Sequence, residues 1–359
     1  MGMIRATLFI VGTCIGAGFV SGAELVRFFG AEGFLTPVLL SSFAFYFLLV
    51  LALLLGKRYG GYQGATDALF KRFAPAVRIA VVLFSFIPCA GFIAGFDALL
   101  PDLKPLLSVA GLLCVSLFVG KGMKGVGILN AVLVPALIVF LFVFGDCITA
   151  FRAWKPVSAS GYWGGAVYAG MNAFLALPVL MDAGKDMKRP RLSAALAAVF
   201  IGACALFVLG AVAREGQSAI GSEMPFLFVM RGNVLFYVAA ALAIATSLCS
   251  SLYPLFALCE AVGKKKKAVK YAARALVLLA AFAFSRLGLA GIVAYCYPIL
   301  GIVGLFFSVF CVFHEYLFEQ HDEEVHSRRQ KAKQKRRAHH KVELEHLPAV
   351  DDKIAKPRL

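Results

Sequence analysis

Ten apolar runs, most of them about 20 residues long, limit what this sequence can fold into more than any other feature. An α-helix needs about 20 apolar residues to cross a bilayer, whereas a membrane β-barrel shows alternating strands of about ten residues. Only 16% of the 359 residues are charged, against about 25% in soluble domains. The sequence therefore predicts an all-α integral membrane protein. The predicted spans are 4–29, 33–55, 77–99, 105–119, 126–148, 161–183, 192–213, 232–262, 268–290 and 292–318.

The chain has a net charge of +16, which could suggest a nucleic-acid partner. The positions of its Lys and Arg residues indicate instead how the protein is oriented in the membrane. With the N-terminus inside, 29 of the 36 Lys and Arg residues fall on the cytoplasmic side. The positive-inside rule then predicts that both termini lie in the cytoplasm. Residues 319–359 form a basic tail that we expect to be disordered. Its polybasic run Arg328–Arg337 is suited to binding anionic lipid, although a simply solvated tail also explains it.

The ten spans divide into two sets of five, over residues 4–150 and 161–318, which together form one transmembrane domain. Because five is odd, the second set starts on the opposite side of the membrane from the first. Two units of opposite orientation form the inverted repeat of one transporter architecture. The first span of each set carries a break signal: four glycines in the stretch Gly12–Glu24, and Tyr168–Asn172 followed by Pro178. We therefore expect helices 1 and 6 to be broken.

The stretch from Gly12 to Glu24 reads G-T-C-I-G-A-G-F-V-S-G-A-E. In a broken membrane helix, freed N–H groups can face an anion and freed carbonyls a cation. The amides near Gly16–Phe19 are thus candidates for holding a substrate carboxylate. The alternative is helix packing, because small residues four apart let neighbouring helices approach closely. The second break signal and the nearby acid favour the binding site.

The sequence alone allows two interpretations of Glu24. A carboxylate inside a spanning segment is a candidate functional group. Arg27 lies three residues further on, however, and an ion pair within the helix would explain both charges. Two other acids, Asp97 and Asp182, lie near predicted span ends, where solvation at the membrane interface is expected.

The eighth span offers a cluster of hydroxyl groups. From Ala243 it reads A-I-A-T-S-L-C-S-S, which places Thr246 above Ser250 and Ser247 above Ser251 on the helix. Hydroxyl oxygens suit a small cation. The alternative is that each hydroxyl bonds back to a carbonyl one turn earlier. The sequence leaves both interpretations open.

The motif G-T-x-I-G-A-G-F-x-S-G-x-E, with Phe28 and Phe29 after it, resembles the YkvI-like bacterial membrane proteins. These belong to the amino acid–polyamine–organocation superfamily, which has the LeuT-type fold of five plus five helices. The sequence G-K-R-Y-G-G at Gly56–Gly61 is similar to a loop of neurotransmitter–sodium symporters, and Tyr168–Asn172 looks like the break in the family's sixth helix. The resemblance covers residues 4–318. It implies a transporter of a small solute, such as an amino acid, in a bacterial inner membrane.

In sodium-coupled members of this fold, one ion is held by carbonyls of the first helix and by a carbonyl and two hydroxyls of the eighth. Segment 126–149, where some sodium-independent relatives carry a lysine, contains none, which favours a bound cation. Phe19 stands where sodium symporters often use an asparagine for a second ion, so a second Na+ site is not expected. The resemblance implies one Na+ site, with the ligands Gly12, Ile15, Ala243, Thr246 and Ser247.

The predicted function is Na+-coupled secondary transport by alternating access. Glu24 is also a candidate gate or proton site, so proton-coupled transport is one rival. The other rival is a membrane receptor that keeps the transporter fold and signals. No nucleophile–base set, metal-ligand pattern or phosphate loop occurs in the cytoplasmic segments, so neither an enzyme nor an organic cofactor is expected. The residues expected to face the substrate are Gly16, Ala17, Gly18, Phe19, Tyr168, Gly170 and Asn172.

Overall fold

A computed structural model of the chain describes residues 2–30, 32–152, 159–262 and 266–315. Every regular element in these ranges is a helix, which confirms the predicted all-α class. The chain separates into two compact units, Met1–Val309 and Phe310–Leu359. The basic tail, with its polybasic run and its predicted lipid contact, lies outside the described residues.

Ten helical segments of the described chain match the ten predicted spans. Seven of them are long and apolar enough to cross a membrane, and three shorter apolar helices complete the set. The first span consists of α1 (Met3–Cys14), α2 (Ala17–Ser21) and α3 (Ala23–Phe29). The others are α4 (Leu35–Tyr59), α6 (Ala74–Leu99), α7 (Leu106–Val119), α8 (Met123–Phe144), α10 (Ala159–Gly184), α11 (Pro190–Glu215), α14 (Val234–Val262), α15 (Lys267–Phe284) and a last span, Leu289–Glu315, which starts with α16 (Leu289–Gly291). Between them lie α5 (Tyr62–Phe70), α9 (Cys147–Arg152), α12 (Gln217–Ile220) and α13 (Pro225–Val229).

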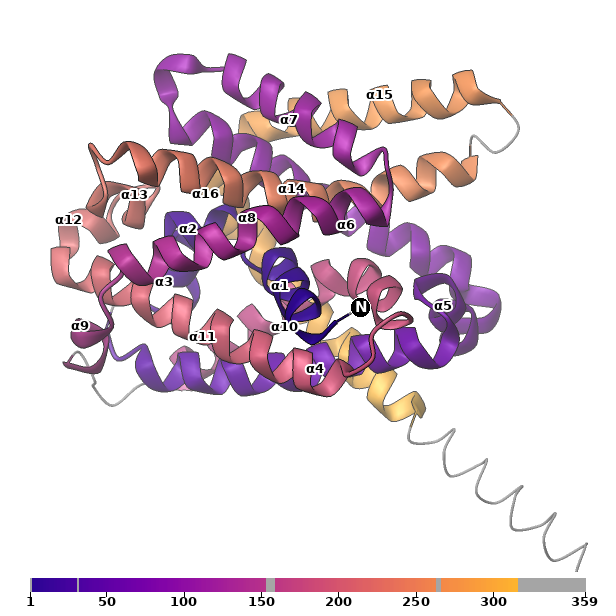
Figure 1. Cartoon of the computed structure of the whole chain (residues 1–359), viewed down its shortest axis with the longest axis horizontal. Helices are drawn as coiled ribbons and strands as arrows, with labels where there is room; N and C mark the ends of the chain where they lie inside the picture. The colour runs from indigo at the N-terminus through magenta and orange to yellow at the C-terminus, as the bar shows by residue number, and fades with distance from the viewer. Residues whose placement is uncertain (1, 31, 153–158, 263–265, 316–359) are drawn as a thin grey trace, which may run out of the picture. The chain divides into compact units, whose positions relative to one another are not determined.

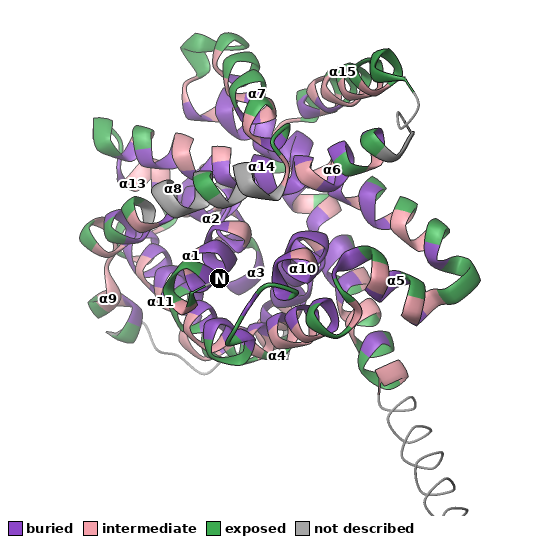
Figure 2. Cartoon of the chain, turned by 45° about the vertical axis from the view of Figure 1, so that its right-hand side comes forward, coloured by how far each residue is buried: buried purple, intermediate pink, exposed green. Residues whose placement is uncertain are grey.

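Helix α1 lies inside the unit Met1–Val309, where it packs against α8, α11 and α14 (Figure 1). By contrast, α7 and α15 show many exposed and intermediate residues (Figure 2). The exposed side chains include large apolar ones: Leu117 of α7 is 73% exposed, and Leu276 and Leu279 of α15 are each 68% exposed. Apolar surface of this extent is expected where lipid covers a membrane protein. The first span is therefore in the interior, and α7 and α15 are at the periphery.

Helix α10 is continuous over all 26 residues, so the break predicted near Gly170 is wrong. The glycine serves close packing instead, because a Cβ there would lie 2.7 Å from Gly301 O in the last span. Asn172 Nδ2 donates to Tyr168 O at 3.1 Å, a bond within the helix that uses one of the two N–H donors of the amide. Pro178 removes one backbone donor, a loss that membrane helices tolerate when other helices surround them.

Candidate functional site

The first span is broken inside the glycine-rich stretch, as the sequence predicts. Helix α1 ends at Cys14, Ile15 and Gly16 have extended backbones, and α2 begins at Ala17. A second interruption, at Gly22 with φ 78°, separates α2 from α3. Carbonyls at the end of α1 and N–H groups at the start of α2 therefore lack partners within their own helices.

Helix α14 brings a hydroxyl group to this break. Ser247 Oγ donates to Ile15 O at 2.8 Å, although the two residues are 232 positions apart in the chain. Gly16 permits the approach, because a Cβ there would lie 3.0 Å from Ser247 Oγ. Two of the predicted cation ligands are thus in direct contact.

The remaining predicted cation ligands stay on their own helices. Thr246 Oγ1 donates to Ala243 O at 2.9 Å, so these two are paired on α14. Ser250 Oγ donates in the same way to Thr246 O at 3.3 Å. Gly12 is buried within α1. Thr246 and Ser250 therefore each bond back to a carbonyl of their own helix, as the alternative interpretation expects. Ser247 instead bonds across to Ile15, just after α1.

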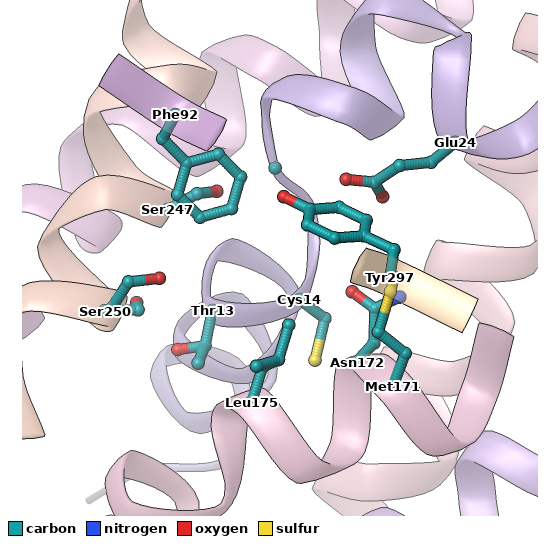
Figure 3. Close-up of a pocket in the computed structure, with 12 residues that line it drawn as sticks. Thr13, Cys14, Glu24, Phe92, Met171, Asn172, Leu175, Ser247, Ser250 and Tyr297 are labelled. Carbon is teal, nitrogen blue, oxygen red and sulfur yellow. The ribbon is translucent and has the colours of Figure 1, made fainter. Parts of the chain in front are cut away.

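A small closed pocket lies beside the break (Figure 3). Its volume is about 20 Å³, room for about one water molecule. Residues from the first span, α6, α10, α14 and the last span meet around it. The lining consists of Thr13, Cys14, Gly16, Glu24, Phe92, Met171, Asn172, Leu175, Ser247, Ser250, Ser251 and Tyr297.

Among the residues predicted to face a substrate, Gly16 and Asn172 line this pocket. Tyr168 is 1% exposed and packs against the rings of Phe28 and Phe29, at centroid distances of 5.4 and 5.1 Å. The predicted residues outside the lining of the pocket are Gly18, Phe19, Tyr168 and Gly170, whereas the side chain of Ala17 is not among those described.

Glu24 is 3% exposed, and its side chain folds back onto α2. A Cβ at Gly18 would overlap the Glu24 carboxylate, so this glycine makes room for the acid. The alternative of an ion pair with Arg27 is wrong: Arg27 Nη2 donates to Ala294 O at 3.4 Å. Pro298 has no N–H to offer that carbonyl, which lies one turn earlier. Within the described chain, no Lys or Arg lies at ion-pair distance from Glu24.

Two aromatic residues of the lining, Phe92 and Tyr297, were not predicted from the sequence. Phe92 Cε1 would lie 3.0 Å from a Cβ at Gly16, so this ring forms one wall beside the break. Tyr297 follows the π-helical stretch Ile292–Cys296, a rare conformation that often marks functional sites. The pair Tyr297–Pro298, in the middle of an apolar run, is the sequence signal that could have indicated an irregular helix here.

The two acids near span ends are held by specific bonds rather than by solvent alone. Asp97 is 3% exposed and pairs with Arg286 at 2.6 Å. Asp182 accepts hydrogen bonds from Tyr62 N at 2.9 Å and from Tyr253 Oη at 2.8 Å. It therefore joins α5, α10 and α14 beside a second cavity, of about 450 Å³.

Comparison with known sequences gives two relatives of similar length, both from Bacillus subtilis and both uncharacterised. The protein YyaD is 23% identical over 320 residues, which cover 84% of this chain and 94% of YyaD. The membrane protein YkvI is 25% identical over 323 residues, 83% of this chain and 91% of YkvI. No family model matches the chain. These identities support a multi-pass membrane protein similar to YkvI.

Comparison with solved structures identifies the fold. MhsT, solved in complex with L-phenylalanine, superposes with a TM-score of 0.65 over 86% of this chain and 88% of its own, at 16% identity. The chain has the LeuT-type fold. A Na+-coupled sialic acid symporter, solved in a substrate-bound outward-open state, gives a TM-score of 0.57 at 15% identity, over 86% of this chain and 76% of its own. In this chain, the helices of the broken first span, α1 and α2, both contact α14.

Proposed function

We propose that this protein is a secondary transporter that moves a small solute by alternating access, coupled to Na+. The observation that carries the proposal is the 2.8 Å bond from Ser247 Oγ to Ile15 O. It joins the hydroxyl cluster of α14 to the open carbonyl end of a broken membrane helix. Transporters with broken helices use such freed carbonyls to hold their coupling ions.

The Na+ site consists of three backbone carbonyls and two hydroxyl groups. In the described state each hydroxyl donates to a carbonyl of the same set: Ser247 to Ile15, and Thr246 to Ala243. When a cation binds, the hydroxyl oxygen and the carbonyl oxygen of each pair both face its positive charge, instead of sharing the hydroxyl proton. The five oxygens belong to Gly12, Ile15, Ala243, Thr246 and Ser247.

The solute binds next to the ion, at the start of α2. The backbone N–H groups of Gly16–Phe19 hold a carboxylate, because a helix N-terminus offers free donors and a positive dipole end. Asn172, which lines the pocket from α10, supplies a polar side chain opposite them. The solute is therefore a small compound with an anionic or zwitterionic head.

The closed pocket also indicates that some lining residues move during the cycle. Small-molecule sites usually enclose about 300 Å³ or more, against about 20 Å³ here. Phe92 and Tyr297 are the large rings of the lining. We expect one or both to move aside when the solute enters.

The cation site is tested by substituting its two hydroxyl groups. Thr246→Ala with Ser247→Ala should abolish Na+-stimulated uptake in proteoliposomes and Na+-dependent stabilisation of the purified protein by a solute, since only binding to the native state stabilises it. Ser116→Ala removes a hydroxyl that bonds within α7 and serves as the matched control. Unchanged Na+ dependence in the double variant would overturn the cation assignment. Solute binding without any flux would favour the receptor.

Proton coupling through Glu24 is the second candidate, because this acid is buried in the pocket. Under proton coupling, uptake is indifferent to Na+, depends on pH and is lost in Glu24→Gln. Uptake measured in matched Na+ and K+ buffers over a range of pH separates the two coupling ions.

A further inference from the structure

Among the described residues that line it, the pocket beside the break contains one acid and no base. Among its lining residues Glu24 is the single carboxylate, and Lys, Arg and His are absent from the lining. A buried carboxylate without a positive partner is costly, by several kcal/mol in real proteins. The pocket is therefore suited to a ligand that brings a positive charge to Glu24.

Three of the five hydroxyl groups in the lining of the pocket present acceptors rather than donors. A hydroxyl has one proton to donate, and these three donate to backbone carbonyls. Thr13 Oγ1 donates to Phe9 O at 2.8 Å, Ser247 Oγ donates to Ile15 O at 2.8 Å, and Ser250 Oγ donates to Thr246 O at 3.3 Å. Their remaining lone pairs face a ligand as acceptors. A ligand group rich in N–H donors fits this lining better than an acceptor group does.

Tyr297 adds a polar group close to Glu24. In Figure 3 the Glu24 carboxylate and the Tyr297 hydroxyl face the same space beside the break between α1 and α2. Tyr297 is 1% exposed, and its hydroxyl has no hydrogen-bond partner in the part of the chain that the structure describes. A buried polar atom without a partner costs free energy until a ligand or water supplies one.

Charge balance then indicates the class of solute. The positive charge of one Na+ at the proposed site and the negative charge of one ionised Glu24 cancel. The solute that completes a neutral pocket carries no net charge, with a positive group at Glu24 and an equal negative charge elsewhere in the molecule. An amino acid has this arrangement.

We propose that the Glu24 carboxylate binds the protonated amine of a zwitterionic amino acid, with Tyr297 as a further contact. Gly18 is a positioning residue, because only a glycine there leaves room for the Glu24 side chain. The proposal rests on the transport function above and specifies the solute of the same site.

The test compares ligands that differ only in the amine. The purified full-length protein is titrated, with Na+ present, with a panel of amino acids and with the matching 2-hydroxy acids, and thermal stability is followed. At least one amino acid should stabilise the protein, and its 2-hydroxy acid should bind about 100-fold more weakly, because an unpaired buried charge remains. A panel in which no amino acid stabilises the protein, or in which the 2-hydroxy acids bind equally well, overturns the proposal.

Two variants of the acid complete the test. Glu24→Gln should weaken amino-acid binding about 100-fold while stabilisation by Na+ alone persists, which shows that the variant is folded. Glu24→Asp, which keeps the charge, should recover part of the affinity. Glu260→Gln makes the same chemical change at an acid that pairs with Arg274, away from the pocket, and should leave binding unchanged. Unaltered amino-acid affinity in Glu24→Gln, with loss of pH-dependent uptake, would assign Glu24 to proton transfer.

Two experimental outcomes separate the role of Glu24 in binding an amine from the transport function. Na+-dependent uptake of a solute that has no amine would contradict the role of Glu24 and leave transport intact. Amine-dependent binding that requires Glu24, without flux in proteoliposomes, would contradict transport and leave the recognition role intact.

Discussion

At the scale of single residues, Asp146 illustrates how one carboxylate outside the spans can stabilise a connection. It precedes α9, and it accepts hydrogen bonds from Thr149 N at 3.0 Å and from Thr149 Oγ1 at 2.8 Å. Arg214 Nη1 lies 3.2 Å from its second oxygen. The backbone N–H of Thr149, and then its hydroxyl and Arg214, lower the pKa of Asp146. A lowered folded-state pKa stabilises the protein above the unfolded pKa, and that stabilisation is lost as pH falls through the folded value.

We therefore expect Asp146→Ala to destabilise the protein at pH 7, by about 1 kcal/mol for a lost N-cap. The difference from the unsubstituted protein should shrink as pH falls below about 4, the usual pKa of an aspartate. Thermal unfolding at pH 7 and at pH 3 measures both effects. The control Asp102→Ala removes an exposed acid. An equal loss of stability at the two pH values would contradict this role.

Gly18 and Gly170 show that one residue type can serve different purposes within one chain. Gly18 leaves space for the buried Glu24 side chain. Gly170 instead lets α10 approach the backbone of the last span. Both glycines first suggested a broken helix, and in each case the neighbours in space decide the role.

At the scale of elements, α10 is held to the last span by a contact between glycines. A Cβ at Gly304 would overlap Gly170 O and would lie 2.7 Å from Phe174 Cβ. We expect Gly304→Ala to destabilise the protein by about 1–3 kcal/mol, the usual cost of overpacking. Gly291→Ala in the same span meets nothing within 4 Å and should be neutral or slightly stabilising. Thermal unfolding of both variants checks the pair, and equal effects would contradict close packing as the reason for Gly304.

The first span shows why a broken helix can be read from sequence and a continuous one misread. Gly16 and Gly22 both lie where the helix of the first span is interrupted, and each interruption falls in a run with several glycines. In α10, Gly170 and Pro178 are eight residues apart, and close helix neighbours sustain the helix between them. Glycine density does not separate the two cases, because α10 also carries four glycines within ten residues, Gly161, Gly164, Gly165 and Gly170. Three of these glycines, Gly164, Gly165 and Gly170, admit backbone oxygens of neighbouring segments, so they serve close packing instead of a break.

At the scale of the whole molecule, the distribution of Lys and Arg predicts that both termini are cytoplasmic. The connection that contains α12 and α13 then lies on the outer side of the membrane. An epitope tag inserted after Gly221 should react with antibody in spheroplasts, and a tag after Leu359 should react only after the membrane is permeabilised. Labelling of the C-terminal tag in spheroplasts that are not permeabilised would contradict the orientation.

The sequence by itself determined the ten spans, the break at Gly16 and the hydroxyl cluster at Thr246 and Ser247. Each of these follows from local properties: the length of an apolar run, glycine density, or residues that recur at helical spacing. The sequence did not decide whether Glu24 and Arg27 form an ion pair. Their spacing allows one, but in the structure Arg27 bonds to Ala294 O instead.

Only the tertiary structure decided which of these residues meet. Ser247 reaches Ile15 across 232 residues, whereas Thr246 bonds to its own helix, because only one of two adjacent hydroxyls can face α1. Tyr297 comes to the pocket from the opposite end of the chain. Contacts between helices depend on how the helices pack around one another, and no spacing along a single helix records that.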